Sequence, residues 1–228
     1  HAGGVAHNKT YSNSHEAIEG SLEKGFGYIE LDFSWTKDEQ LVCLHDWGKS
    51  FQKVFPKESP RPQTLKGFVH LREKSSLKPC TLDSLKELLS QHPRLFLITD
   101  VKNSNKKGLQ LIAKELKGQL SQVIPQIHKR QSYPLVKKMG YNKIILTLYR
   151  FSGNNEEVVD LVKDLDLFAV TMSSKRAMEG LGNYLNALGM STYVYTVNDT
   201  QEAKSLLTNY GITSIYTDYI MPRSLCES

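Results

Sequence analysis

Short apolar runs alternate along this chain with segments whose apolar residues recur at helical spacing. The apolar runs predict strands at residues 28–34, 95–102, 122–127, 143–149, 167–172, 192–198 and 214–218. The helical spacing predicts helices at residues 14–24, 82–89, 107–116, 132–139, 155–163, 177–188 and 200–209. Several of these helices follow a Ser, Thr, Asp or Asn cap, such as Thr81, Asn154 and Asn198. This alternation is typical of parallel βαβ units in an α/β protein.

The strand count favours a closed (β/α)8 barrel, or TIM barrel. Seven strands are predicted, and an eighth is expected just ahead of His1, before the first helix. A doubly wound open sheet is the alternative, but its glycine-rich nucleotide loop has no counterpart in the opening residues HAGGVAH. We therefore predict one barrel domain over residues 1–228, with the first strand truncated at the N-terminus.

One segment, residues 48–80, interrupts the alternation. It contains prolines and eight Lys or Arg against two Glu, and it follows a strand-like run at residues 41–45. It is predicted to be an insertion near the rim where barrel active sites form. Either it is a solvated surface loop or it is a collar that attracts an anionic substrate. Nucleic-acid binding is not expected, because aromatic residues are sparse among its basic ones.

The composition is that of a globular protein. The 228 residues are 39% hydrophobic and 23% charged, with a formal net charge of +5. No apolar run approaches the ~18 residues that a membrane span needs, so no transmembrane segment is expected. The chain opens on His1 without a methionine. We expect residues ahead of His1, and an extracytoplasmic location, secreted or periplasmic, is preferred to the cytoplasm.

The three cysteines give little chemistry by themselves. Cys43, Cys80 and Cys226 are odd in number and lack CxxC spacing, which argues against a zinc site and a disulfide framework. One disulfide stays open, although ordinary thiols are the preferred interpretation.

Three carboxylates fall on the inner faces of two predicted strands. In YIELDFSW, residues 28–35, side chains alternate, so Glu30 and Asp32 share one face. In LFLITDVK, residues 95–102, Asp100 and Lys102 share a face at the same end of the next core strand. Buried anions need a positive partner. Three oxygen donors suit Mg²⁺ or Ca²⁺ better than zinc; the alternative is an internal salt bridge in which Lys102 alone neutralises the carboxylates.

Two histidines complete the candidate site. His1 and His45 also lie at predicted strand ends, and an imidazole pair can supply one acid and one base at neutral pH. Each histidine alone is weak evidence. Their joint placement with the carboxylates and the lysine at one barrel mouth is what indicates catalysis.

Six motifs together resemble the glycerophosphodiester phosphodiesterase family. In chain order they are HAGG, SNSHEA, IELDFSWTKDEQLVCLHDW, ITDVK, VYTVNDTQEA and IYTDY, and they span nearly the whole chain. The resemblance implies a (β/α)8 barrel that hydrolyses phosphodiesters with a divalent cation and two histidines. By motif position it implies these roles: His1 and His45 as the histidines; Glu30, Asp32 and Asp100 as metal ligands; Lys102 facing phosphate; Asn13 as the family's asparagine at the opening of the first helix.

The chain departs from the family pattern at several positions. Ala2 stands where the family has Arg, so one phosphate contact is lost or supplied elsewhere, with Arg150 a candidate. Asp100 replaces a Glu, which bears on the preferred cation. Tyr195 replaces a Trp, and Ser12 replaces a Glu. We therefore expect a subgroup whose leaving group or head group differs from that of the best-known members.

The resemblance, read with the charges, implies a two-step reaction. The cation and Lys102 neutralise the phosphate oxygens. One histidine deprotonates a neighbouring hydroxyl or a water while the other protonates the leaving alkoxide, and which does which is left open. Gln126, Arg150, Tyr195 and Asn198 join Asn13 as candidates to line the substrate pocket.

Two other functions stay open, and the substrate is left as a class. One alternative is a phospholipase D-like transphosphatidylase acting on lysophospholipids or sphingomyelin, which would use the same residues. The other is a barrel that binds a phosphorylated ligand without catalysis. The expected partner is a small phosphodiester or a phospholipid-derived substrate, and oligomeric state is not assigned.

Overall fold

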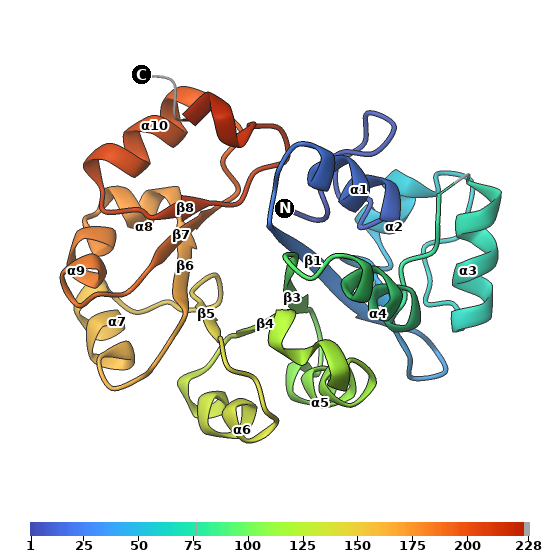
Figure 1. Ribbon diagram of the computed structural model, residues 1–228, viewed down its shortest axis with the longest axis horizontal. Helices are drawn as coiled ribbons and strands as arrows, with labels where there is room; N and C mark the ends of the chain where they lie inside the picture. The colour runs from blue at the N-terminus through green and yellow to red at the C-terminus, as the bar shows by residue number, and fades with distance from the viewer. Residues whose placement is uncertain (76, 226–228) are drawn as a thin grey trace. The chain divides into compact units, whose positions relative to one another are not determined.

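A computed structural model describes residues 1–75 and 77–225, without the side chains of residues 72–74. The chain divides into two compact units, His1–Val123 and Ile124–Ser228 (Figure 1). Both units combine parallel strands with helices, as the sequence predicts for an α/β protein.

The first unit is built on a three-stranded sheet in the order β2-β1-β3. Its strands are β1 (Tyr28–Trp35), β2 (Leu41–Cys43) and β3 (Phe96–Val101); β3 is parallel to β1 and β2 is antiparallel to it. The helices are α1 (His15–Glu23), α2 (Lys49–Val54), α3 (Leu65–Lys74), α4 (Leu82–Gln91), α5 (Asn105–Glu115) and the 3₁₀ turn η1 (Lys117–Gln122). Thr81 caps α4 in a capping box with Ser84, as the sequence predicts.

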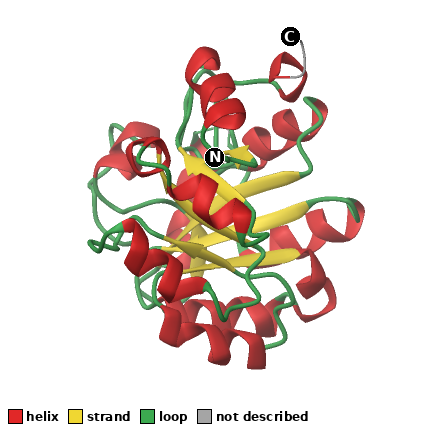
Figure 2. Cartoon of the chain, turned by 90° about the vertical axis from the view of Figure 1, so that its left-hand side faces the viewer, coloured by secondary structure: helices red, strands yellow, loops and turns green. Residues whose placement is uncertain are grey.

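The second unit is a parallel sheet in the order β4-β5-β6-β7-β8. Figure 2 colours the helices and strands of the chain by secondary structure. The strands are β4 (Val123–Ile127), β5 (Ile145–Thr147), β6 (Ala169–Ser173), β7 (Thr192–Tyr195) and β8 (Ser214–Ile215). The helices are α6 (Tyr133–Lys138), α7 (Asn155–Val162), α8 (Ser174–Met178), α9 (Leu181–Ala187) and α10 (Thr200–Asn209), with 3₁₀ turns η2 (Arg130–Ser132) and η3 (Pro222–Leu225). Asn154 caps α7, as predicted.

Two local predictions in the second unit are wrong. The single helix expected over residues 177–188 is two helices, α8 and α9, because Gly180 between them has φ +92°, a conformation that favours glycine and ends a helix. The cap of α10 is Asp199, whose carboxylate accepts from the Glu202 N–H at 2.8 Å, and not Asn198.

The basic segment at residues 48–80 is not a plain solvated loop. It contains α2 and α3, and its apolar side chains form a core with β2 and the loop after it. Phe51 and Phe68 are fully buried, and Trp47 packs against both rings. The segment therefore has its own hydrophobic anchor, while lysines such as Lys49 and Lys66 remain exposed.

Cys43 and Cys80 form a disulfide, so interpreting them as ordinary thiols was wrong. The bond joins the end of β2 to the end of the basic segment, 37 residues further along the chain. The Cys43 N–H also donates to the Cys80 carbonyl at 3.0 Å, and Val42 and Thr81 form an antiparallel bridge. The spacing gave no sign of this pair, because the intervening residues fold back on themselves as helices. Cys226 lies outside the described residues.

Candidate active site

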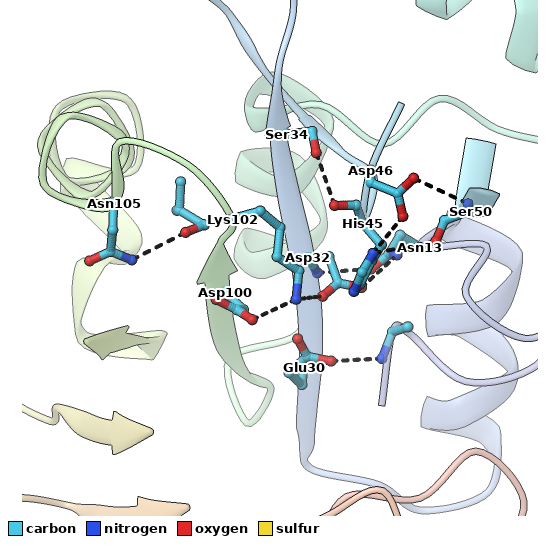
Figure 3. Close-up of polar contacts among 12 residues, drawn as sticks. Asn13, Glu30, Asp32, Ser34, His45, Asp46, Ser50, Asp100, Lys102 and Asn105 are labelled. Carbon is cyan, nitrogen blue, oxygen red and sulfur yellow. Dashed lines mark hydrogen bonds and ion pairs between the residues drawn. The ribbon is translucent and has the colours of Figure 1, made fainter. Parts of the chain in front are cut away.

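The carboxylates of Glu30, Asp32 and Asp100 converge at β1 and β3. The parallel register sets Asp32 directly beside Asp100, and Glu30 is two residues earlier on the same face of β1. One oxygen from each lies within 4.8 Å of the others, and all three side chains are buried. Figure 3 shows these side chains turned toward one another. The prediction that the alternating pattern gathers the three acids is confirmed.

Lys102 bridges two of these carboxylates. Its ammonium lies 2.6 Å from Asp32 Oδ1 and 2.6 Å from Asp100 Oδ2. Burial alone would lower the pKa of this lysine, but the charges of Asp32 and Asp100 outweigh that effect and raise it above its ordinary value. Lys102 is therefore a permanent cation in the cluster, and its single charge opposes three carboxylates.

Glu30 is held by the first residues of the chain. The Ala2 N–H donates to Glu30 Oε2 at 2.8 Å, and the Gly3 N–H donates to the Glu30 carbonyl at 2.9 Å. This turn requires glycine at position 4, where φ is +107° and a Cβ would collide with the Ser21 hydroxyl. Burial, followed by the negative charge of Asp32, raises the pKa of Glu30 to about 8.

Asn13 orients Asp32. Its Nδ2 donates to Asp32 Oδ2 at 3.1 Å, and its Oδ1 accepts from the Asp32 N–H at 2.9 Å. Asn13 is fully buried, with φ +48°, at the start of α1. Both ends of the amide therefore contact the metal-ligand candidate; its expected contact with substrate stays a prediction.

His45 lies just after β2, and the contacts that orient its ring are made at Nδ1. Nδ1 is 2.8 Å from Asp46 Oδ2 and 3.3 Å from Ser50 Oγ (Figure 3). Although burial opposes it, hydrogen bonds with Ser50, His45 and Gly48 lower the pKa of Asp46 to about 2. An ionised Asp46 favours a proton on Nδ1, which leaves Nε2 as the nitrogen for acid or base chemistry.

His1 belongs to the first unit, like the three carboxylates. Its positive charge lowers the pKa of Glu30, in opposition to burial and to the charge of Asp32. Its ring makes an edge-to-face contact with Tyr11, with centroids 4.7 Å apart. Tyr11 makes a second contact of this kind with His45, at 5.5 Å. The structure therefore brings both predicted histidines to one aromatic ring in the unit that carries the carboxylates.

The donor set fits a hard divalent cation. Oxygens on opposite sides of a bound Ca²⁺ or Mg²⁺ lie roughly 4 to 5 Å apart, and the three carboxylates offer oxygens within 4.8 Å of one another. With all three carboxylates ionised, Lys102 neutralises one of three negative charges, so a dication that displaces the Glu30 proton would complete the balance. Glu30, Asp32 and Asp100 are the residues that would hold it.

The other four predicted substrate-binding residues belong to the second unit. Gln126 is buried in β4, and Tyr195 ends β7. The Arg150 guanidinium lies 5.2 Å from the ring centroid of Tyr149. Asn198 Nδ2 donates to Asp218 Oδ2 at 2.8 Å, and its Oδ1 accepts from the Asp218 N–H at 2.8 Å. Their contact with a substrate stays a prediction.

Three residues were missed by the sequence reasoning. Asp46 was missed because neighbouring side chains of an extended chain point apart, whereas the chain bends at His45. Ser50 was missed because it reaches the His45 ring only where the chain turns into α2. Tyr11 was missed because its loop has left-handed residues that break any face pattern; its own φ is +61°. The Asp directly after His45 was the available signal for the first.

The fold and the site define a class: an α/β protein of the (β/α)8 type in which a buried cluster of three carboxylates, compatible with a divalent cation, lies in the same unit as two imidazoles that share a contact with Tyr11. Residues 1–58 match the family model described as the glycerophosphoryl diester phosphodiesterase family. This stretch contains His1, His45 and two of the three carboxylates. The expected resemblance to the glycerophosphodiester phosphodiesterase family is confirmed there. No curated protein sequence matches the chain.

Solved structures extend the likeness in fold to the whole chain. A glycerophosphodiester phosphodiesterase from Thermotoga maritima has 20% identity and a TM-score of 0.71, covering 90% of this chain and 88% of that one. One from Parabacteroides distasonis has 18% identity and a TM-score of 0.72, covering 95% and 89%. An Oleispira antarctica phosphodiesterase, solved with the product sn-glycerol-3-phosphate, has 16% identity and a TM-score of 0.70, covering 95% and 91%. These likenesses confirm the predicted fold class.

Proposed function

We propose that this protein is a phosphoric diester hydrolase that acts on glycerophosphodiesters or related phospholipid head groups. The observation that carries the proposal is the convergence of Glu30, Asp32 and Asp100 in the unit where His1 and His45 contact one ring. The family match over residues 1–58 supports hydrolysis of a phosphodiester. The product complex of the Oleispira antarctica phosphodiesterase supports a small glycerophosphate ligand.

A divalent cation, Mg²⁺ or Ca²⁺, would be held by the three carboxylates. When bound, it supplies positive charge that stabilises the developing negative charge on the phosphoryl oxygens. Lys102 adds a permanent positive charge at Asp32 and Asp100. The side-chain amide of Asn13 fixes Asp32: it donates to the carboxylate and accepts from the backbone N–H of the same residue.

His1 and His45 would exchange the proton. One imidazole takes a proton from the attacking hydroxyl, which belongs to water or to the substrate, and the other gives a proton to the leaving alkoxide. Asp46 supports a neutral His45 with its proton on Nδ1, so Nε2 can accept, and it also stabilises the doubly protonated ring that results. The same Asp46 therefore supports both halves of an acid-base cycle.

An oxidising compartment, secreted or periplasmic, is part of the proposal. The Cys43–Cys80 disulfide supports it, because such bonds persist outside the reducing cytosol. Among the residues that the structure describes, no helix is long and apolar enough to cross a membrane.

The test is a panel of phosphodiesters with the products identified. Glycerophosphocholine, glycerophosphoethanolamine, lysophosphatidylcholine and sphingomyelin are each incubated with Mg²⁺, with Ca²⁺ and with EDTA. We expect sn-glycerol-3-phosphate and a free alcohol from the small diesters. Cyclic phosphate from the lipids alone would favour the transphosphatidylase, and tight binding without turnover would favour a binding protein.

A further inference from the structure

The ring of Tyr11 contacts both imidazoles of the site. Its centroid lies 4.7 Å from that of His1 and 5.5 Å from that of His45, with interplanar angles of 85° and 83°. Both contacts have the edge-to-face geometry that aromatic rings prefer. Because the two histidines share this neighbour, their centroids lie no further apart than the sum of the two separations.

Lys53 holds this part of the loop. Its ammonium donates to the hydroxyl of the buried Thr10 at 2.8 Å and lies 5.4 Å from the Tyr11 ring centroid. An ammonium at this distance from a phenol ring is attracted to it by the cation–π interaction. The position of Tyr11 is therefore tied to α2, the helix that carries Lys53.

The same helix also holds His45. Asp46 Oδ1 accepts from the Gly48 N–H at 2.7 Å and from the Ser50 N–H at 3.3 Å, at the start of α2. Asp46 Oδ2 is the partner of the His45 ring. The start of α2 thus holds Asp46, which contacts the His45 ring, and Lys53 of the same helix holds Tyr11.

We propose that Tyr11 is a positioning residue that sets the separation and orientation of the His1 and His45 imidazoles, with Lys53 holding Tyr11 in place. This inference rests on the proposed function, because it assigns these two rings the transfer of protons. It gives the basic segment a specific role, which is to organise the histidines from α2.

The expected kinetic effect is on turnover. Misplacing a reacting group by about 1 Å can cost on the order of 10²-fold in rate. Tyr11→Leu should lower kcat roughly 10- to 100-fold. KM should change less than about threefold, since the proposed phosphate-binding groups are the cation and Lys102 rather than Tyr11. Tyr11→Phe keeps the ring and should stay within about threefold of the wild type.

Nuclear magnetic resonance gives a readout that does not depend on activity. The ring centroids of His1 and His45 lie 4.7 Å and 5.5 Å from that of Tyr11, close enough for its ring current to shift their imidazole C–H signals. Tyr11→Leu should therefore move both signals, and Tyr11→Phe should leave them nearly in place. His15 and His92, which belong to α1 and to the end of α4, serve as internal references for an intact fold. Movement of one histidine signal alone would overturn the shared contact.

A matched pair of lysine variants tests the second half of the proposal. Lys53→Met should lower kcat roughly 3- to 10-fold, and Lys49→Met, an exposed lysine of the same helix, should not. Equal losses in Tyr11→Leu and Tyr11→Phe, or full activity in Tyr11→Leu, would overturn the inference. A wild type that hydrolyses no phosphodiester would instead remove the proposed function and leave the ring contacts to be judged by their spectra.

Discussion

The side-chain amide of Asn13 makes two hydrogen bonds with Asp32. Its Nδ2 donates to the Asp32 carboxylate at 3.1 Å, and its Oδ1 accepts from the Asp32 backbone N–H at 2.9 Å. The pair connects the loop before α1 to β1 and fixes one carboxylate of the acidic cluster. Because Lys102 approaches the other oxygen of Asp32, this carboxylate has little freedom to turn. The orientation of the Asp32 carboxylate is thus set by Asn13 and Lys102.

Asn13→Ala should therefore weaken cation binding. Partners that orient metal ligands typically contribute 10- to 100-fold in affinity or activity, so we expect a loss of about that size. The free energy of unfolding should also fall by about 1 to 3 kcal/mol, because Asp32 loses buried partners. Isothermal titration with Ca²⁺ or Mg²⁺ measures the first effect, and urea denaturation measures the second. Asn186→Ala, on the exposed surface of α9, is the control and should change neither.

Cation binding should strengthen as the pH rises toward 8. The pKa of Glu30 is raised to about 8, so below that pH a proton competes with the cation for the carboxylate. We expect the affinity to fall by up to roughly tenfold for each pH unit below 8. Titrations at several pH values test this, and Glu30→Gln should flatten the profile. A flat profile in the wild type would contradict the raised pKa.

The same group affects stability in the cation-free protein. The folded pKa of Glu30, about 8, exceeds the ordinary 4.5, so the folded state binds more protons than the unfolded state between these values. The free energy of unfolding should therefore decrease as the pH rises from 4.5 to 8, and added Ca²⁺ or Mg²⁺ should reduce that loss. Urea denaturation across this range, with and without the cation, measures both effects. Stability that rises with pH and ignores the cation would contradict them.

Asp46→Asn should lower turnover without unfolding the protein. The amide oxygen of asparagine can accept the same hydrogen bonds from the Gly48 and Ser50 N–H groups, so the start of α2 should persist. The charge that favours a proton on His45 Nδ1 is lost, and we expect kcat to fall on the order of 10²-fold. Steady-state kinetics alongside a melting curve separates the two effects. An unchanged kcat would show that Asp46 only accepts the backbone N–H groups at the start of α2.

Asp46 should also affect how the free energy of unfolding depends on pH in the acid range. Its pKa is about 2 in the folded protein, below the ordinary 3.8, so its stabilising contribution is present above pH 3.8 and is lost as the pH falls toward 2. The Asp46→Asn variant should lack this loss of stability between pH 3.8 and pH 2. Denaturation curves of both proteins between pH 2 and 5 make the comparison.

The Cys43–Cys80 disulfide should stabilise the histidine-bearing region. It closes a loop of 37 residues in sequence separation, for which chain entropy predicts about 4 kcal/mol. The double variant Cys43→Ser with Cys80→Ser should unfold at lower urea concentration and lose activity first, because His45 lies two residues beyond Cys43. Cys226→Ser leaves the pair intact and is the control. Equal stability with and without reductant would contradict the prediction.

The sequence correctly predicted those features that depend only on residues close together along the chain. Alternation along a strand placed Glu30, Asp32 and Asp100 on one face, because side chains of a strand have a period of two. The caps at Thr81 and Asn154 were found because a cap is read within four residues. Such features depend on a few neighbouring residues, and they were correct.

What the sequence could not supply depends on chain turns and distant partners. Tyr11 and Asp46 reach the histidines only because their loops leave extended geometry, as the φ of +61° at Tyr11 shows. The Cys43–Cys80 pair forms across two helices whose packing no spacing rule describes. The cap of α10 was misplaced by one residue because Asn198 and Asp199 are both good capping residues, and Asn198 instead binds Asp218.

We propose that the three buried carboxylates bind a dication that phosphodiester hydrolysis requires. The most direct measurement follows glycerophosphodiester hydrolysis by the wild type and by Asp32→Asn as EDTA and then Mg²⁺ or Ca²⁺ are added. We predict that chelation abolishes wild-type turnover, that the cation restores it, and that Asp32→Asn stays inactive throughout while remaining folded. Full turnover in EDTA, or in Asp32→Asn, would contradict the account.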